Sequence, residues 1–318
     1  MPKNNSEESL EEKLSQVHIP EPEEFVRRAA GIQDFYGLLF ADNQLIKYAV
    51  LNNNRQIKNI YLIKETNSDM LALLAVKDDI YFEHKDSKIH SLFGKFRGKE
   101  GGDPVESLVE HDGKIVDAGD YGIYETIPNK HLMEMDDFTD LKVNTVRSLS
   151  SFKNKLYALV AYNTYNNTKS YFVELAENNG KYHMNNIIID YDDGGGEICQ
   201  AVILPDVLSK IKGKQYDFSV LSCAYNDYLD LNGEKIEGTE EDYDYIFRLA
   251  LLSSDSERAE VAYSGDLREI KLAKINLKHQ RAKTEMLIPD LSDTISALEV
   301  VRNAGLHKHL ISIGNKIR

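Results

Sequence analysis

A short apolar motif repeats in phase along the chain, and this periodicity constrains the fold more than any other feature of the sequence. The copies begin at Met70, Val105 and Val146. A leucine follows each start after three residues, and two further strand-type residues follow after ten and eleven: Leu73, Leu108, Leu149, Ile80, Ile115, Leu156, Tyr81, Val116 and Tyr157. Self-similarity at roughly 35 to 50 residues is typical of repeat architectures, whose units bury their faces on one another. The sequence therefore predicts an array of short strands.

The copy from Val146 to Asp190 shows the complete unit. It contains four runs rich in β-branched and aromatic residues, VRSLSSF, KLYALVAY, SYFVEL and KYHMNNIIID. Lys153 and Asn154 separate the first two runs, and an Asn-Gly pair at Asn179 and Gly180 separates the last two, which is a strong hairpin signal. Four antiparallel strands in succession resemble one blade of the β-propeller superfold. The resemblance implies an all-β fold, and because the chain has no tryptophan, it does not extend to the Trp-Asp signature of WD repeats.

The ends of the chain predict how such a ring closes. The segments ISALEVVR and HLISIGNKIR supply two strands before Arg318, and the region from Tyr36 to Lys64 supplies two more at the other end. A propeller closes by pairing N-terminal outer strands with C-terminal inner strands. We therefore expect one β-propeller domain over residues 31–318. Six inner strands are expected near Met70, Val105, Val146, Ile198, Ile246 and Ile295. Five blades, with a large insertion between about residues 226 and 265, is the alternative.

The first thirty residues differ from the repeat array. Asn5 and Glu8 fit a capping box, and Leu10, Leu14 and Val17 then share one helical face. Residues 1–30 are therefore predicted to be an arm with a short amphipathic helix, either docked on the array or extending to a partner.

The charge balance limits the classes of partner. The chain carries 38 basic and 52 acidic residues, a net charge of −14, which disfavours a nucleic-acid backbone. It begins with a polar segment and contains no apolar run of the roughly 20 residues that span a bilayer. With only Cys199 and Cys223, it does not depend on a disulfide scaffold. These features predict a cytoplasmic protein that binds neither membranes nor nucleic acid.

Acidic residues recur at one position of the repeat, in the loops that lead from each outer strand to the next inner strand. In propellers these loops surround the mouth of the central channel. Converging carboxylates would focus a negative potential there, and loop tyrosines beside them could stack on a cation or sugar. The predicted ligand-binding residues are Asp69, Asp103, Asp193, Glu197, Asp244, Asp293, Tyr191 and Tyr243. The alternative interpretation is an ordinary solvated surface, because Asp favours turns in any acidic protein.

The sequence assigns no cofactor with certainty, but these loops would suit a divalent cation such as calcium, and a polyamine or a basic peptide would suit them too. Calcium takes six to eight oxygen ligands, and the glycine-rich segment DYDDGGGE offers several carboxylates in one loop. The predicted metal ligands are Asp190, Asp192, Asp193 and Glu197. The segment does not match the EF-hand pattern. His307 and His309, two apart on a predicted strand, would share one face but have no assigned third ligand.

Two classes of function remain. The first is a non-catalytic binding scaffold whose acidic channel mouth captures a protein partner, a cation or a small cationic ligand. The second is a propeller hydrolase or lyase of the glycosidase or lactonase type, with Asp103, Asp193, Glu197 and Asp293 as its carboxylates. Nucleotide-binding and hydrolase motifs such as GxGxxG, HExxH and GxSxG are absent from the sequence. The sequence therefore favours the scaffold.

Overall fold

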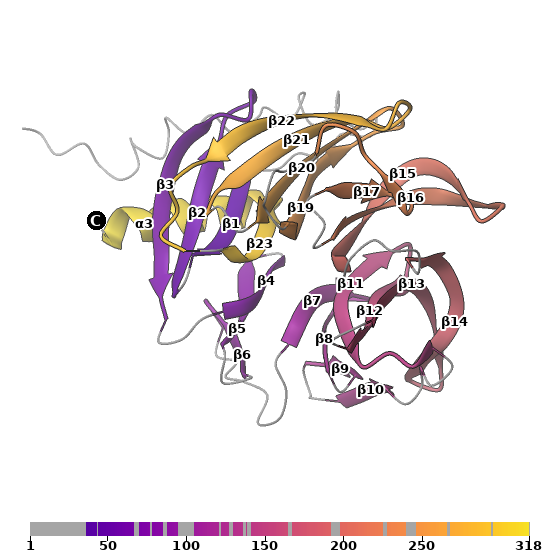
Figure 1. Cartoon of the computed structure of the whole chain (residues 1–318). Helices are drawn as coiled ribbons and strands as arrows, with labels where there is room; N and C mark the ends of the chain where they lie inside the picture. The colour runs from indigo at the N-terminus through magenta and orange to yellow at the C-terminus, as the bar shows by residue number, and fades with distance from the viewer. Residues whose placement is uncertain are drawn as a thin grey trace, which may run out of the picture.

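The computed structural model describes residues 36–317 apart from short gaps at 43, 67–69, 77, 85–87, 95–104, 121, 127–129, 136–137, 139–140, 165–166, 192–197, 225–227, 240–245, 266–267 and 294. The predicted arm, residues 1–30, lies outside the described residues. Within them the chain forms six antiparallel sheets, which are the blades of a β-propeller (Figure 1). The prediction of an all-β propeller with six blades is confirmed.

Each blade is a meander whose strands follow one another from the channel outward. Five described sheets have four strands and one has three. The first two blades contain β4 (Met70–Val76), β5 (Asp79–His84) and β6 (Lys88–Ser91), then β7 (Val105–His111), β8 (Lys114–Gly119), β9 (Gly122–Glu125) and β10 (Lys130–Glu134). The next two contain β11 (Thr145–Phe152), β12 (Lys155–Thr164), β13 (Asn167–Asn178) and β14 (Lys181–Asp190), then β15 (Ile198–Ile211), β16 (Lys214–Ala224), β17 (Leu229–Leu231) and β18 (Glu234–Lys235). The fifth contains β19 (Ile246–Ser254), β20 (Arg258–Gly265), β21 (Ile270–Asn276) and β22 (Arg281–Ile288). The six predicted inner-strand starts match β4, β7, β11, β15, β19 and β23 within one residue.

The sixth blade joins the two ends of the chain. Its strands are β23 (Ile295–Val301), β1 (Gly37–Asp42), β2 (Leu45–Leu51) and β3 (Ile57–Glu65), in that order. Inner strand β23 pairs antiparallel with β1, and Phe40 lies opposite Leu298. Closure by strands from both termini is confirmed, but the division differs from the one expected. The C-terminus supplies one strand, and the N-terminal region supplies three because the chain turns between Asp42 and Leu45.

The last segment of the chain is a helix, so the prediction of a second C-terminal strand is wrong. Helix α3 (Ala304–Ile317) begins after Asn303, whose side-chain Oδ1 accepts a hydrogen bond from the Leu306 N–H at 3.0 Å as an N-cap does. Its buried side includes Leu306, Leu310 and Ile311. Apolar residues at helical spacing therefore override the apparent alternation of HLISIG.

Local turn chemistry sets the hairpins as the sequence indicated. Asn179 and Gly180 both have positive φ, 54° and 74°, in the two-residue turn between β13 and β14. Asp112 and Gly113 do the same between β7 and β8. These φ values match a type I′ hairpin turn, where asparagine, aspartate and glycine carry the smallest steric penalty.

Six apolar clusters hold the ring together, one at each contact between neighbouring blades. The cluster containing Val160, for example, also contains Val116 from the preceding blade. The other five likewise combine residues of two adjacent blades, and the cluster of the sixth blade with the first also includes α3. Among the described residues, no helix has the length and apolar character needed to cross a membrane.

Candidate functional site: the central channel and its mouth

The inner strands of all six blades line a cavity of about 310 Å³ along the central channel. Its wall includes Leu73, Leu108 and Leu149, which are 6 %, 8 % and 7 % exposed. The leucines that reveal the repeat in the sequence are thus the apolar wall of the channel.

Polar side chains on the inner strands β7, β11, β15 and β19 each form a hydrogen bond to the backbone of the next inner strand. Ser107 Oγ on β7 accepts a hydrogen bond from the Leu149 N–H on β11 at 3.0 Å. Ser148 Oγ on β11 accepts one from the Ala201 N–H on β15 at 3.1 Å. Ser107 and Ser148 each directly follow an irregularity in the strand pairing. Such bulges redirect side chains, and here the redirected hydroxyls reach the neighbouring blade.

The next two blades extend the same arrangement with longer side chains. Gln200 Oε1 accepts from the Leu249 N–H at 2.8 Å, and Gln200 Nε2 donates to the Leu249 carbonyl at 3.1 Å. Arg248 Nε donates to the Ser296 carbonyl at 2.6 Å. Each link joins residues between the second and fifth positions of the two strands. The inner strands therefore run side by side in the same direction, and their starts surround one mouth of the channel.

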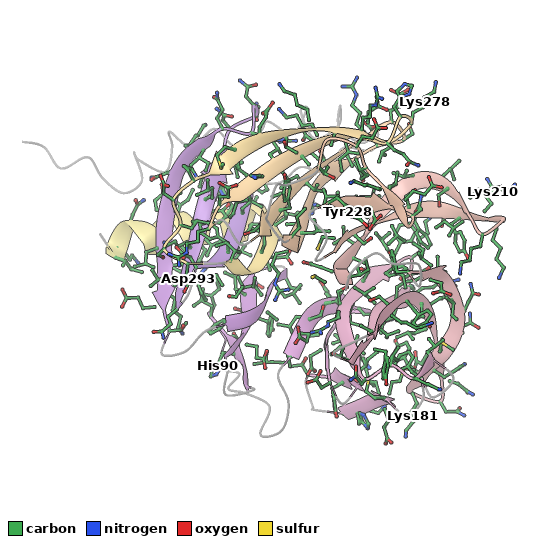
Figure 2. All side chains as sticks on the ribbon, viewed as in Figure 1. His90, Lys181, Lys210, Tyr228, Lys278 and Asp293 are labelled. Atoms are coloured by element: carbon green, nitrogen blue, oxygen red, sulfur yellow. The ribbon has the colours of Figure 1, made fainter. Side chains whose placement is uncertain are left out.

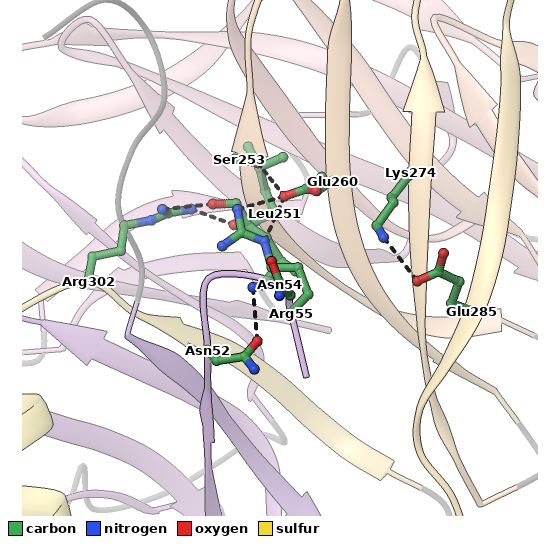
Figure 3. Close-up of polar contacts among 10 residues, drawn as sticks. Asn52, Asn54, Arg55, Leu251, Ser253, Glu260, Lys274, Glu285 and Arg302 are labelled. Carbon is green, nitrogen blue, oxygen red and sulfur yellow. Dashed lines mark hydrogen bonds and ion pairs between the residues drawn. The ribbon is translucent and has the colours of Figure 1, made fainter. Parts of the chain in front are cut away.

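The channel wall carries charge as well as leucine. Arg147 lies 3.5 Å from Glu106 on the neighbouring inner strand. Arg302, which follows β23, donates hydrogen bonds to the carbonyls of Leu251 and Leu252, the latter at 3.1 Å (Figure 3). These contacts hold basic side chains in the channel of an acidic protein.

Glu299 is the channel group whose charge is most altered by its surroundings. Burial raises its pKa to about 7, although the Val300 N–H, which donates to Glu299 Oε1 at 2.8 Å, and the positive charge of Arg302 both oppose the rise. Protonation of Glu299 therefore changes the charge of the channel near neutral pH.

The sequence predictions did not include the charged residues of the channel wall, such as Arg248, Glu299 and Arg302. For the ion pair of Glu106 and Arg147 the repeat did offer a signal, because each comes one residue after the matching starts Val105 and Val146. For Glu299 and Arg302 the repeat offers no such signal, because their surroundings are formed by segments distant in the sequence.

Most of the predicted mouth residues lie outside the part of the chain that the structure describes: Asp69, Asp103, Asp192, Asp193, Glu197, Tyr243 and Asp244. Their roles as ligands stay predictions. The structure does describe Asp190, Tyr191 and Asp293.

Asp293 belongs to a loop that is fastened to the closing blade. Its N–H donates to Asp42 Oδ1 at 2.9 Å, and the Ser292 N–H donates to Asp42 Oδ2 at 3.3 Å. Asp42 also bonds Lys47 and is fully buried. Burial would raise the pKa of Asp42, but the hydrogen bonds from Lys47 and Ser292 outweigh it and keep the pKa below its ordinary value. The backbone at Asp293, which is labelled in Figure 2, is thus fixed to the end of β1.

Asp190 and Tyr191 occupy different environments although they are neighbours. Asp190 is exposed and lies 3.8 Å from the Lys212 ammonium. The Tyr191 hydroxyl is buried, and its ring packs against the cluster that contains Phe218. Burial raises the pKa of this phenol above its ordinary value. The hydroxyl end of Tyr191 therefore faces the interior.

The described residues offer no support for a metal centre. Within the described residues, no three His, Cys, Asp or Glu side chains come together in a way that could hold an ion. The predicted pair of histidines separates on α3. His307 Nδ1 is hydrogen-bonded to Tyr48 Oη at 2.7 Å, whereas the His309 ring stacks on Phe93. Cys199 and Cys223 are buried free thiols.

Comparison with known proteins gives a structural likeness without a family. No protein-family model matches the chain, and no curated protein is significantly similar in sequence. Among solved structures, the WD40 β-propeller domain of Doa1 is similar with a TM-score of 0.44 at 11% identity, covering 73% of this chain and 72% of that one. U3-55K has a TM-score of 0.47 at 11% identity and covers 87% of each chain. YCF48 bound to D1 peptide has a TM-score of 0.45 at 11% identity, covering 80% of this chain and 81% of that one. The six-bladed architecture of this chain rests on its own strand pairing.

Proposed function

We propose that the chain is a non-catalytic binding scaffold that captures a protein partner, through a basic segment, at the acidic mouth of its channel. The observation that carries this proposal is the convergence of the inner-strand starts. The hydrogen bonds made by Ser107, Ser148, Gln200 and Arg248 support it because they join neighbouring inner strands side by side within the first five residues of each strand.

The acidic sequence positions come directly before those starts. Asp69 precedes Met70, Glu197 precedes Ile198, and Asp103, Asp244 and Asp293 each lie two residues before an inner strand. Carboxylates brought together in this way would attract a cationic partner over a distance and speed its association. The binding surface itself would be rigid because linked strands support it, which lowers the entropy lost on binding.

The hydrolase alternative has less support from the channel. Acid–base hydrolysis of glycosides needs two carboxyl groups across the scissile bond. Among the described channel residues, Glu299 has a raised pKa, whereas Glu106 faces Arg147 in an ion pair. The described channel residues thus supply one candidate acid but no second carboxyl group to act as base or nucleophile, so binding is the function we propose.

Neutralising the mouth tests the proposal. A variant combining Asp69→Asn, Asp103→Asn, Asp244→Asn and Asp293→Asn should bind a fluorescein-labelled polylysine peptide at least about tenfold more weakly than the wild type, since each lost charge pair removes a fraction of a kcal/mol or more. Fluorescence anisotropy at two salt concentrations measures the change.

The matched control removes the same number of charges elsewhere. It combines Asp217→Asn, Glu234→Gln, Glu237→Gln and Glu285→Gln. Equal weakening in both variants would mean that net charge alone attracts the peptide, and the proposal would fail.

We propose as a second, independent ligand a calcium ion bound by the predicted loop carboxylates, and this is tested separately. Calcium that binds only the folded state raises the unfolding midpoint. A rise in calcium over EDTA that disappears in an Asp193→Asn, Glu197→Gln variant is the expected result, and no shift in the wild type would rule out a calcium-loaded mouth.

A further inference from the structure

The hairpin of β15 and β16 projects from the rim of the propeller, beyond the neighbouring blades in Figure 1. β15 has 14 residues and is the longest strand in the described part of the chain. The next strand, β17, pairs only with Leu221–Cys223 of β16. The outer half of the hairpin is therefore a two-stranded ribbon at the edge of the molecule.

A bulge in this ribbon turns a leucine toward solvent. Between the pairs Pro205–Phe218 and Ser209–Tyr216, β15 contains three residues and β16 one, and Asp206 has a φ of 60°. Val207 points inward and is 5 % exposed, whereas Leu208 is 70 % exposed. Among the large apolar side chains that the structure describes, Leu208 is the most exposed. Bulges commonly redirect a side chain for a purpose.

Leu208 borders a groove of about 460 Å³ between the turns of neighbouring hairpins. The β15–β16 tip supplies Leu208, Lys210 and Lys212, and the turn after β21 supplies Lys278. Two carboxylates, Asp190 at the end of β14 and Glu234 on β18, also line the groove. We call this the lysine groove. In Figure 2, Lys210 and Lys278 lie near the outer ends of two different hairpins.

The lysine groove has more lysines than carboxylates: Lys210, Lys212 and Lys278 against Asp190 and Glu234. Lys210 and Lys278 have no ion-pair or hydrogen-bond partner among the described residues. Lys212 lies at 3.8 Å from Asp190, and Lys214 bonds only the neutral amide of Asn186, at 3.4 Å. The lysine groove therefore stands out on a chain whose net charge is −14.

We propose that the lysine groove binds an acidic peptide segment of a partner protein. An apolar side chain of the peptide packs on Leu208, and its carboxylates bond to Lys210, Lys212 and Lys278. Charge complementarity selects an acidic segment, and the exposed leucine selects one that carries an apolar residue. The lysine groove shares no lining residue with the channel cavity, and its proposal does not depend on the function proposed for the mouth.

Binding of a defined probe tests the lysine groove. The probe is a fluorescein-labelled peptide with two leucines flanked by glutamates, and its anisotropy reports binding to the full chain. Leu208→Ser and the Lys210→Glu, Lys278→Glu double variant should each weaken binding by about tenfold or more. Replacing the peptide's leucines by serines should weaken it similarly.

Lys283→Glu is the matched control, because Lys283 is 80 % exposed on β22 and lies 3.3 Å from Glu285, away from the lysine groove. It should bind the peptide as the wild type does. The proposal would be overturned if Lys283→Glu weakened binding as much as the groove variants do. It would also be overturned if a peptide with lysines in place of its glutamates bound as tightly.

Measurements on the wild type and the same variants would also reveal two other possible occupants of the lysine groove. A dimer in sedimentation velocity that Leu208→Ser converts to a monomer would assign the groove to a second copy of the chain and overturn the proposal. Stronger binding of single-stranded DNA than of the peptide would also overturn it.

Discussion

At the scale of single residues, burial decides which charges the propeller carries near neutral pH. Glu299 on the channel wall has a pKa of about 7, and Asp230 on β17 has a pKa of about 6, in both cases because burial disfavours the carboxylate. Glu285 on the surface shows the opposite shift, because Lys274 and Lys283 lower its pKa. The pKa of a carboxyl group therefore shifts in opposite directions in the interior and at the surface.

Glu299→Gln should stabilise the protein at pH 8 and change little at pH 5. The folded-state pKa of Glu299 lies above its ordinary value, so the folded state binds the proton more tightly, and the resulting stability is lost as pH rises from about 4.5 through about 7. The amide keeps the neutral form at every pH, and the gain at pH 8 should be about 1–3 kcal/mol. Thermal unfolding at the two pH values measures it. Glu285→Gln is the control, and a gain of similar size in that variant would refute the assignment to burial.

At the scale of secondary structure, α3 packs on the sheets at the point where the ring closes. His307 bonds Tyr48 and stacks on Tyr36, with ring centroids 5.0 Å apart. Gly314 lies so close to β3 that a Cβ added there would be 2.5 Å from the Tyr61 Cβ. Burial lowers the pKa of His307 to about 4, so the docked helix holds this imidazole neutral. The helix is thus fitted to the sheet at both ends.

Gly314→Ala should destabilise the protein by about 1–3 kcal/mol, because its methyl group would overlap Tyr61 and force the helix away from the sheet. Gly305→Ala in the same helix is the matched control. Its Cβ would meet only the Asn303 Oδ1, at 3.1 Å, and alanine has the better helix propensity. Chemical denaturation measures both variants. Equal effects would show that α3 does not need this close approach.

At the scale of the whole molecule, stability depends on closure of the ring. Each apolar cluster lies between two blades, so a blade buries its faces only when both neighbours are present. The fully buried Asp42 fastens the loop before β23 to the end of β1, across 250 residues of sequence. A carboxylate at one position thus stabilises the junction on which all six interfaces depend.

Asp42→Asn should lower the free energy of unfolding by about 2–4 kcal/mol at pH 7, because it removes the charge that holds Lys47 and weakens the bonds from Ser292 and Asp293. The folded-state pKa of Asp42 lies below 3.8, so this stability is present above that value and is lost as pH falls through the folded-state pKa. Denaturation curves at pH 7 and at low pH measure the loss. Asp217→Asn, in an exposed pair with Lys153, should change little. If both variants behaved alike, the closure would not depend on Asp42.

The sequence by itself determined the features that form between neighbours in the chain. Antiparallel hairpins pair adjacent segments, so the repeat that begins at Met70, Val105 and Val146 and turns such as Asn179–Gly180 were enough to predict six blades. The starts of the inner strands followed from the same sequence pattern, and the placement of the acidic loops around the channel mouth stays a prediction.

Only the tertiary structure decided what depends on segments far apart. Residues 309–314 alternate like a strand, yet they form a helix because Tyr48 and Tyr61, more than 240 positions earlier, supply the surface against which they pack. The raised pKa of Glu299, the buried hydroxyl of Tyr191 and the exposure of Leu208 likewise depend on which side chains of other strands surround them. Local pattern fixes strands and turns, whereas burial and charge depend on the neighbours that folding brings together.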